Sequence, residues 1–306
     1  MKEISIITVN YHQPQITIDF LQSVKANTHE SQVEVILVDN GQLNNDGNRY
    51  RSVYPNLVYI QSAENLGFAG GNNLGVKYAT GEFLLFLNND TEISDNLTEV
   101  LVQELKNNDT IGLISPLILY FDSPDIIQYA GYTEMNYITC RNRGIGAMQK
   151  DTNQYANDSR ETGYCHGAAM MCRRNQLQGI GLMEEQYFLY YEELDWCEKF
   201  RKAGKKIWFT GRTSILHKES MSVGKESSIK TYFMTRNRML FIRRNTGILN
   251  KTLFTVYYVS IACTKQIFAY LLNGRKDLIK YVLKGLWWNF THNKDSHNLG
   301  FKLNNQ

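Results

Sequence analysis

An alternation of strand-like and helix-like segments over the first 120 residues constrains the fold of this chain more than any other feature. Five segments rich in β-branched or large apolar residues are predicted to be strands: 4–9, 33–39, 57–60, 83–87 and 111–119. Helical patterns lie between them, over 14–28, 72–80 and 95–108. This βαβ succession predicts an α/β fold with a mostly parallel, Rossmann-like sheet flanked by helices.

Polar residues occupy the carboxyl ends of three of the predicted strands. They are Thr8, Asn10 and Tyr11 at the first strand, Asp39 at the second, and Asn88, Asn89 and Asp90 at the fourth. Ligands of open α/β sheets bind beyond the carboxyl ends of the strands. A single aspartate there is often only a helix cap or a turn residue, but three such strand ends together predict one ligand cleft.

The glycine pattern argues against a dinucleotide enzyme. The Rossmann fingerprint requires G-x-G-x-x-G directly after the first strand, and that turn reads NYHQPQ, without glycine. The glycine-rich stretch comes later, in ENLGFAGGNNLG (64–75), before a predicted helix. Small residues at a helix N-terminus can hold a phosphate or admit a sugar, although glycines in a turn often serve only the backbone.

Cysteine usage and the lengths of the apolar runs indicate a cytoplasmic protein. The five cysteines form no CxxC pair, which suggests neither a zinc ribbon nor a disulfide framework. The N-terminal apolar run stops at Val9, too early for a secretory signal. The longest later run, 253–263, is well short of the roughly 20 residues that span a bilayer, so no transmembrane helix is expected.

The C-terminal quarter is strongly basic. Residues 225–306 contain 14 Lys or Arg against 3 Asp or Glu, a net charge of +11, whereas residues 1–224 contain 19 against 27, a net charge of −8. Such a segment often meets phosphates of nucleic acid or of anionic lipid, and a solvated helical face is the alternative. Nucleic-acid binding is not expected here, because the aromatic residues stand with Leu and Ile rather than between arginines.

Residues 276–290 are predicted to form an amphipathic helix. Lys276, Lys280 and Lys284 repeat every four positions beside an apolar stripe (Leu278, Ile279, Val282, Leu283 and Leu286) and two tryptophans. This pattern fits a helix that lies on the inner face of a membrane as a peripheral contact. The alternative is packing onto the rest of the chain or onto a second subunit of a homo-oligomer.

Six segments together resemble a known family. They are SIITVNYHQP, VILVDNG, ENLGFAGGNN, FLLFLNNDTE, GAAMMCRR and YFLYYEELDWCEKFRKAGKKI, in this order, and the similarity runs through about residue 245. The pattern resembles glycosyltransferase family 2, specifically its rhamnosyltransferase-like branch. The resemblance implies a GT-A fold, a nucleoside-diphosphate sugar as donor, a divalent metal (Mg²⁺ or Mn²⁺) and inversion at the anomeric carbon.

The implied activity is that of an inverting hexosyltransferase. It would move a sugar, with rhamnose as a candidate, to a glycan or lipid-linked saccharide acceptor in cell-surface polysaccharide synthesis. Residues 1–120 would form the nucleotide-sugar-binding half, 121–224 the acceptor-binding and catalytic half of the same domain, and 225–306 a basic helical extension. The alternative is a non-catalytic nucleotide- or sugar-binding relative, which Asn88 favours because the family's D-x-D-like motif begins with Asp.

The resemblance assigns the metal to Asp90, the last residue of that motif. Mg²⁺ and Mn²⁺ prefer hard oxygen ligands and substrate phosphates, so one protein carboxylate can suffice. His217, in SILHKES after a predicted strand, would complete the metal site, although a lone histidine is often only a hydrogen-bonding residue. Asn88 is neutral, so it would weaken metal binding and contact the ribose instead.

The resemblance also assigns donor and acceptor residues. Those assigned to the donor are Thr8, Asn10, Tyr11 and Asp39 around the nucleoside, and Asn65, Gly67, Gly70 and Asn73 near the diphosphate and sugar, together with Asn88 and Asn89. Asp39 would accept a hydrogen bond from the N–H edge that uracil and thymine share. The acceptor would meet His166, Gly167 and Ala168.

Three carboxylates, Glu192, Glu193 and Asp195, open a predicted helix. The helix dipole alone favours acidic residues in a first turn, but crowded carboxylates also raise a pKa, as a general base requires. The family places its base at the second position of the acidic pair, where Asp is usual. We therefore predict Glu193 as base, Glu192 as its support or an acceptor ligand, and Asp195 as a residue that caps or orients the helix.

Overall fold

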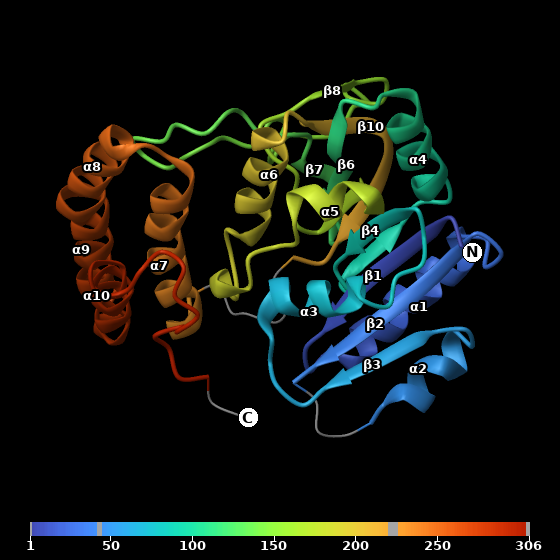
Figure 1. The fold of residues 1–306 in the computed structure, drawn as a ribbon, viewed down its shortest axis with the longest axis horizontal. Coiled ribbons are helices and arrows are strands. Elements are labelled where there is room, and N and C mark those ends of the chain that lie inside the picture. Colours follow the sequence, from blue (N-terminus) through green and yellow to red (C-terminus); the bar gives the residue numbers. More distant parts are fainter. Residues whose placement is uncertain (1, 42–44, 220–225, 304–306) are drawn as a thin grey trace.

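The chain folds around one sheet that carries helices on both faces. The computed structural model describes residues 2–41, 45–219 and 226–303. The order of the strands across the sheet is β3 (Val58–Ser62), β2 (Val33–Asn40), β1 (Ile4–Asn10), β4 (Phe83–Leu87), β9 (Ala169–Arg173), β6 (Ile111–Tyr120), β10 (Lys206–His217) and β5 (Thr91–Ile93). β7 (Ser123–Tyr129) pairs with β6, and β8 (Ser159–Glu161) pairs with β10. Figure 1 shows the sheet on the right and the C-terminal helices on the left.

The N-terminal half of the sheet is parallel, and the predicted α/β fold is confirmed. β1 pairs in parallel with β2 and β4, and β2 pairs in parallel with β3. The connecting helices are α1 (Pro14–Asn27), α2 (Gly47–Val53) and α3 (Gly67–Val76). Pro14 suits the start of α1, because the first N–H groups of a helix have no intrahelical partner. The carboxyl ends of β2, β1 and β4 therefore lie side by side.

The other half of the sheet is mixed. β9 runs antiparallel between β4 and β6, whereas β6 and β10 are parallel to each other. β5, β7 and β8 add antiparallel pairings at the edges. The sequence pattern predicts none of β5, β7, β8 and β9, since two of them have only three residues and β7 begins with exposed residues.

Side chains that alternate along the strands divide the core into two layers. Ile4 and Ile6 of β1 pack on the face covered by α1, α2 and α4 (Leu97–Asn107). Ile7 packs on the opposite face with α3, α6 (Glu192–Lys202) and α7 (Ser228–Asn245). The short helix α5 (Leu177–Ile180) lies between β9 and α6 in the chain. The two layers hold the strand ends rigidly in place.

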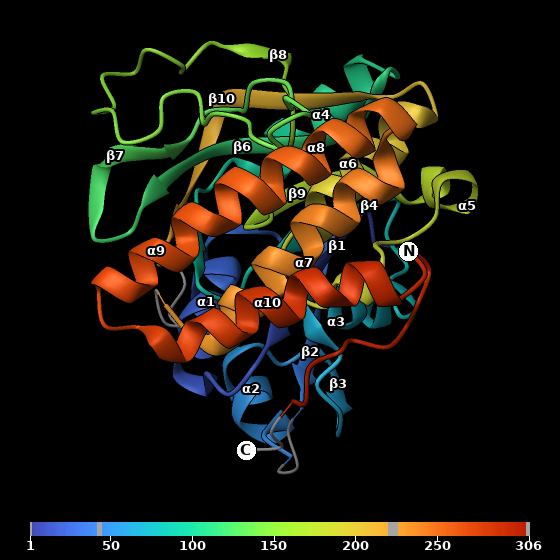
Figure 2. The ribbon, with the colours of Figure 1, turned by 90° about the vertical axis from the view of Figure 1, so that its left-hand side faces the viewer.

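A helical region follows β10. It consists of α7, α8 (Ile248–Tyr257), a π-helical stretch (Tyr258–Cys263), α9 (Thr264–Leu272) and α10 (Lys276–Thr291). Figure 2 shows α8 and α9 continuing into one another across this face, with α10 running back beside them. In the described part of the chain, no helix is long and apolar enough to cross a membrane.

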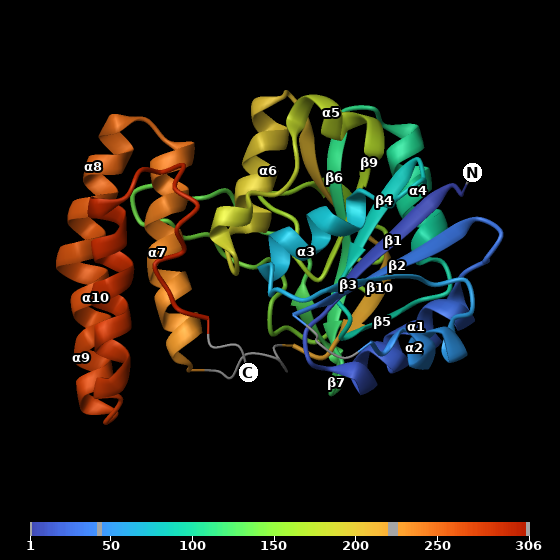
Figure 3. The same cartoon turned by 60° about the horizontal axis from the view of Figure 1, so that its bottom comes forward.

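α10 packs onto α7 through one of its faces. Leu278, Val282 and Leu286, three residues of the stripe expected to meet a membrane, are buried there. That part of the prediction is wrong, because these side chains complete the chain's own core. A second apolar stripe, Leu283, Trp287 and Phe290, remains exposed. The chain after α10 then runs back along α7 toward the sheet (Figure 3).

Candidate active site

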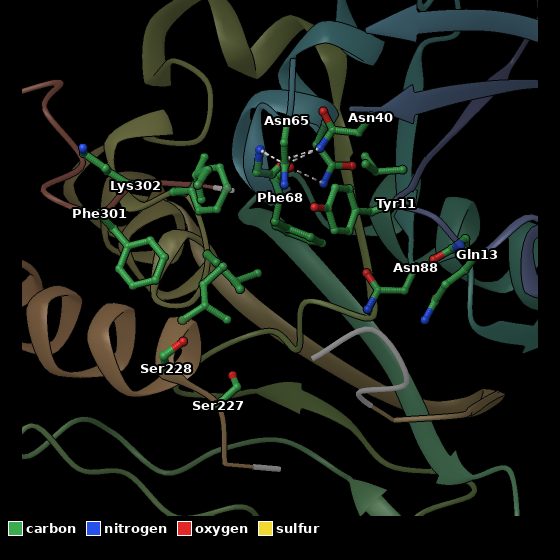
Figure 4. A pocket seen from close by; sticks show the side chains of 18 of the residues that line it. Tyr11, Gln13, Asn40, Asn65, Phe68, Asn88, Ser227, Ser228, Phe301 and Lys302 are labelled. Carbon is green, nitrogen blue, oxygen red and sulfur yellow. Dashed lines mark hydrogen bonds between the residues drawn. The ribbon is translucent and has the colours of Figure 1, made fainter. Parts of the chain in front are cut away.

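A cavity of about 880 Å³ lies at the carboxyl ends of β1, β2 and β4. Tyr11 and Asn88 line it on the side of the sheet, and Phe301 and Lys302 line it from the C-terminal segment. Figure 4 shows these two sets of side chains on opposite sides of the cavity. Its volume is within the range of roughly 300–1,000 Å³ that small-molecule sites have. We call it the strand-end cavity.

A buried hydrogen-bond network lies behind the end of β1. Asp39 accepts from Asn10 Nδ2 (2.7 Å) with one oxygen and from Tyr59 Oη (2.8 Å) with the other. Burial raises the pKa of Asp39. Thr8, Asn10 and Asp39 are fully buried, and none of them lines the strand-end cavity. Asn10 and Asp39 join the strand ends through these hydrogen bonds, whereas Thr8 Oγ1 has no partner among the described residues. The contact of all three residues with a nucleoside stays a prediction.

The loop before α3 shapes the adjoining part of the cavity. Asn40, at the end of β2, accepts from the Leu66 N–H (2.8 Å) and donates to Asn65 Oδ1 (3.2 Å). Gly67 has a φ of +70°, and a Cβ there would collide with the carbonyl oxygen of Phe188. Glycine thus lets two distant segments approach closely. Asn65 and Gly67 both line the cavity.

Gly70 and Asn73 lie farther along α3. A Cβ on Gly70 would come within 2.9 Å of Leu66 Cβ. Asn73 donates to the Met183 carbonyl oxygen and to Glu185 Oε1, both at 2.9 Å. Neither residue lines the strand-end cavity. In this structure they pack α3 against its neighbours, and their contact with the diphosphate and sugar stays a prediction.

The polar triplet after β4 connects the cavity with the interior. Asn88 lines the cavity, and Asn89 donates to Thr17 Oγ1 (2.9 Å). Asp90, which is only 8% exposed, also lines the cavity. Its Oδ1 lies 3.2 Å from Nε2 of His217 at the end of β10. Among the described residues, neither of these two atoms has a hydrogen-bond partner.

The geometry of His217 suits a metal ligand. Its Nδ1 lies 2.9 Å from Gln128 Oε1. In the tautomer that donates this hydrogen bond from Nδ1, Nε2 offers its lone pair toward Asp90. Neighbouring ligands of an octahedral ion, each about 2.1 Å from it, are about 3 Å apart, close to the observed separation. Among the described residues, no group of three or more His, Cys, Asp or Glu could hold a metal. Further ligands would have to come from a substrate or from water.

The predicted acceptor residues lie between this pair and α6. The His166 ring is 5.8 Å from the His217 ring, and its Nδ1 accepts from the Ala168 N–H (3.2 Å). Burial, followed by the charge of His217, lowers the pKa of His166 to about 3. A Cβ on Gly167 would lie 3.8 Å from Glu193 Cγ. The structure thus brings these residues together with both His217 and Glu193.

The three carboxylates of α6 have different surroundings. Glu193 is half-buried, and burial raises its pKa. Glu192 is 3% exposed, its Oε2 has no hydrogen-bond partner among the described residues, and burial and then the Glu193 charge raise its pKa well above the usual range. Asp195 accepts from Tyr187 Oη (2.9 Å) and Asn245 Nδ2 (2.6 Å). Asp195 therefore joins α6 to α7, in line with an orienting role.

The segment before α6 has a strained backbone. Phe188, Tyr190 and Tyr191 have φ values of 64°, 70° and 76°, a region that costs non-glycine residues about 1–3 kcal/mol each. The buried Asn237 of α7 holds this segment. Its Nδ2 lies 2.9, 2.8 and 2.9 Å from the carbonyl oxygens of residues 187, 189 and 190. α7 thereby positions the first turn of α6.

Arg236 links the same segment to the C-terminal chain. It is fully buried and donates to the carbonyl oxygens of Leu299 (2.8 Å) and Tyr187 (3.2 Å). Its guanidinium carbon lies 4.9 Å from the ring centroid of Phe233 and 4.8 Å from that of Trp288. Burial lowers the pKa of Arg236 to about 10, so it remains charged at neutral pH.

A family model described as glycosyl transferase family 2 matches residues 5–181, more than half of the chain. The chain belongs to glycosyl transferase family 2. The match covers the strand-end residues and the triplet after β4. It ends before α6 and β10, so the carboxylates of α6 and His217 lie outside the matched range of this glycosyltransferase.

Two curated relatives are similar to this family 2 glycosyltransferase over most of its length. One is a low-salt glycan biosynthesis hexosyltransferase of Haloferax volcanii, 25% identical over 268 residues, which are 86% of this chain and 81% of the relative. The other is an N-acetylglucosaminyl-diphospho-decaprenol L-rhamnosyltransferase of Mycobacterium tuberculosis, 23% identical over 243 residues, 72% of this chain and 78% of the relative.

Two solved structures share the fold. A Pyrobaculum calidifontis mannosyltransferase in complex with GDP-Man and Mn²⁺ has a TM-score of 0.57 at 12% identity, with 94% of this chain and 87% of that one covered. GalNAc-T7 with UDP, GalNAc and Mn²⁺ has a TM-score of 0.66 at 15% identity, and the match covers 95% of this chain but 56% of that one. The expected GT-A fold is confirmed.

Several cavity residues of this family 2 member have no signal in the sequence. Those farthest along the chain from the strand ends are Tyr281 and Lys284 of α10 and residues of the segment 298–303. Phe188, Leu189, Ser227 and Ser228 line the cavity from closer segments. Ser227 also caps α7 by accepting from the Lys230 N–H (3.2 Å). The basic charge of the C-terminal quarter is the sequence feature that points to this region, and it does not identify these residues.

Proposed function

We propose that this glycosyltransferase is metal-dependent and inverting, and that it uses a nucleoside-diphosphate sugar as donor. The single observation that carries the proposal is the pair formed by Asp90 and His217, whose ligand atoms lie 3.2 Å apart without hydrogen-bond partners among the described residues. Asp90 lines the strand-end cavity, which is large enough for a nucleotide sugar. Solved structures of this fold with Mn²⁺ and a nucleotide support it.

The mechanism assigns a task to each residue of the site. Asp90 and His217 would hold Mg²⁺ or Mn²⁺, which when bound stabilises the negative charge on the departing diphosphate. Tyr11, Asn65 and Asn88 line the cavity in which the donor would lie. Glu193 would take the proton from the acceptor hydroxyl, and its raised pKa makes it a stronger base than an exposed carboxylate.

A binding experiment tests the metal assignment. Calorimetry with a nucleoside diphosphate, with and without Mn²⁺, is expected to show at least about tenfold tighter binding with the metal. Asp90→Ala is expected to abolish that difference. Glu92→Ala is the matched control, since Glu92 lies two residues away and pairs with Lys218 (3.5 Å). An unchanged metal effect in Asp90→Ala, or an equal loss in Glu92→Ala, would contradict the assignment.

The names of the relatives suggest candidates for the transferred sugar and for the acceptor. We propose rhamnose as the candidate sugar and a glycan or lipid-linked saccharide as acceptor, in cell-surface polysaccharide synthesis. One relative is named for glycan biosynthesis, and the other for rhamnosyl transfer to a decaprenol-linked saccharide. Turnover of a panel of nucleotide sugars, with NMR of the anomeric configuration of the product, tests both the donor and inversion. Nucleotide binding without any turnover would instead support a non-catalytic relative.

We also propose a cytoplasmic location with peripheral membrane contact through residues 276–290. All five cysteines are unpaired and buried, as a reducing compartment allows. Leu283, Trp287 and Phe290 of α10 are exposed, as are Ile248, Leu272 and other apolar residues of α8 and α9. These three helices lie beside one another in Figure 2. Sedimentation with anionic vesicles tests the contact, and equal binding of wild type and Trp287→Glu would refute it.

A further inference from the structure

A second cavity adjoins the strand-end cavity along α10. It has a volume of about 800 Å³, and Leu283, Leu286, Trp287 and Phe290 form much of its wall. We call it the α10 groove. Leu283, Trp287 and Phe290 are 53%, 68% and 59% exposed. They stand at positions i, i+4 and i+7, so they form one continuous apolar stripe on the helix.

The α10 groove and the strand-end cavity share two lining residues, Lys284 and Gly300. Lys284 is exposed, and its ammonium lies 5.9 Å from the ring centroid of Tyr281. Gly300 has a φ of +66°, and a Cβ there would collide with Trp288. The absence of a side chain at Gly300 lets the C-terminal segment lie directly against α10. A cation therefore stands where an apolar trough meets the polar cavity.

The C-terminal segment contributes a second cation to the lining of the strand-end cavity. Lys302 lines the strand-end cavity from the C-terminal segment, opposite Tyr11 and Asn88 (Figure 4). From the α10 groove to the strand-end cavity, the lining thus changes from apolar side chains to a lysine and then to polar side chains. An amphiphile with a hydrocarbon chain, a phosphate and a sugar has the same order of groups.

We propose that the α10 groove binds the lipid chain of a lipid-linked acceptor, with the acceptor phosphate at Lys284 and its sugar in the strand-end cavity. This inference rests on the proposed transfer to a lipid-linked saccharide. The ligand class is a prenyl chain joined to a phosphate. Burial of the chain in the apolar groove adds affinity but does not orient the ligand, because the hydrophobic effect is non-directional. The ammonium of Lys284 sets the position of the phosphate.

The experiment measures binding to the full-length protein without using turnover. The probe is farnesyl diphosphate, and its two halves, farnesol and inorganic pyrophosphate, are measured separately. Excess nucleoside diphosphate with Mn²⁺ is added to fill the donor site, and tryptophan fluorescence reports on Trp287 in the groove wall. The intact probe is expected to bind at least tenfold more tightly than either half.

Matched variants locate the ligand. Lys284→Ala is expected to lower the affinity for the probe about tenfold, whereas Lys280→Ala, one turn earlier and also beside Tyr281 (5.0 Å), is expected to leave it unchanged. Leu283→Asp places a charge in the groove and is expected to abolish binding. Leu249→Asp, at a 70% exposed site on α8 outside the groove, is its control.

Three results would overturn the inference. One is equal affinity for the probe and for one of its halves, and another is an equal effect of a variant and its control. The third is equally tight binding of lysophosphatidylglycerol, which would make the groove a general lipid surface. The proposed transferase function is tested separately by nucleotide and Mn²⁺ affinity and by turnover, so either proposal can fail without the other.

Discussion

Replacing Asn237 by Ala tests whether α7 positions the carboxylates of α6, including the proposed base Glu193. The side chain lies in the interior and donates only to the carbonyl oxygens of the strained segment before α6. Its own oxygen accepts from Arg236 Nε (2.8 Å). Alanine removes these hydrogen bonds without adding volume, so the backbone that carries Glu192 and Glu193 loses its support.

The expected loss of stability follows from the contacts. The carbonyl of Tyr187 keeps Arg236 as a partner (3.2 Å), but the carbonyls of residues 189 and 190 lose Asn237. Each buried group left without a partner costs about 1–3 kcal/mol, and Arg236 Nε also loses its acceptor, so we expect a total of at least about 3 kcal/mol. At roughly 2–4 °C per kcal/mol for a chain of this size class, the melting temperature should fall by about 6–12 °C.

The expected loss of activity is larger than stability alone explains. A shift of Glu193 by about 1 Å can lower kcat about a hundredfold. Asn289→Ala is the control, because this buried amide donates to the carbonyl oxygens of Arg236 (2.9 Å) and Gly285 (3.0 Å). It should lower the melting temperature similarly and leave kcat nearly unchanged below that temperature. If Asn237→Ala is destabilised but retains kcat, α7 does not position the base.

Two further predictions concern the carboxylates of α6. Glu193→Gln is expected to keep nucleotide binding and to lose most transfer at saturating donor, whereas Glu192→Gln and Asp195→Asn lose less; near-normal turnover of Glu193→Gln would move the base assignment to another carboxylate. For pH dependence, burial raises the pKa of Glu192 and Glu193 above the ordinary value of 4.5, so the folded protein binds these protons more tightly than the unfolded chain. Their contribution to stability is therefore complete below pH 4.5 and is lost as the pH rises through the raised values, while transfer, which needs an ionised base, increases over the same window. In one pH series, ionisation of these groups should lower the melting temperature while it raises kcat. A parallel rise of both quantities with pH would contradict the assignment.

The part of the site that is local in sequence could be predicted. β4 is five buried apolar residues followed directly by Asn88, Asn89 and Asp90, so strand and polar end are visible in one stretch. The same holds for Tyr11 after β1. The convergence of these ends follows from parallel pairing of adjacent strands, which the βαβ pattern implies.

The role of the glycine-rich stretch could not be predicted. Gly67, Gly71 and Gly75 resemble a phosphate loop in composition, but each lies where a Cβ would strike another part of the chain. The contacts of Gly71 and Gly75 are Val9 and Ile7 of β1, so these glycines bring α3 close to the sheet. Nothing in the local sequence distinguishes such packing from a ligand contact.

The far wall of the cavity could not be predicted either. Phe301 lies across the strand-end cavity from Tyr11, although the two residues are at opposite ends of the chain (Figure 4). Phe301 reaches this position because Leu299 accepts from Arg236 and from Tyr232 Oη, both at 2.8 Å. These hydrogen bonds depend on how α7 and α10 pack, which no periodic pattern encodes.

The structure also changes the meaning of the basic C-terminal quarter. Four arginines of α7 supply much of its charge, and all four bind groups within the chain: Arg236, Arg238, Arg243 and Arg244. Arg238 donates to two backbone carbonyls, and Arg244 pairs with Glu184 (3.0 Å). These guanidinium groups hold helices and loops together rather than meeting a phosphate polymer.

The lysines that line the cavities, Lys284 and Lys302, are exposed instead. Lys265, Lys276 and Lys280 are also exposed but line neither cavity. Two lysines beside a cavity suit a single phosphate-bearing ligand better than a long polyanion, which is why the proposed acceptor phosphate is placed at Lys284.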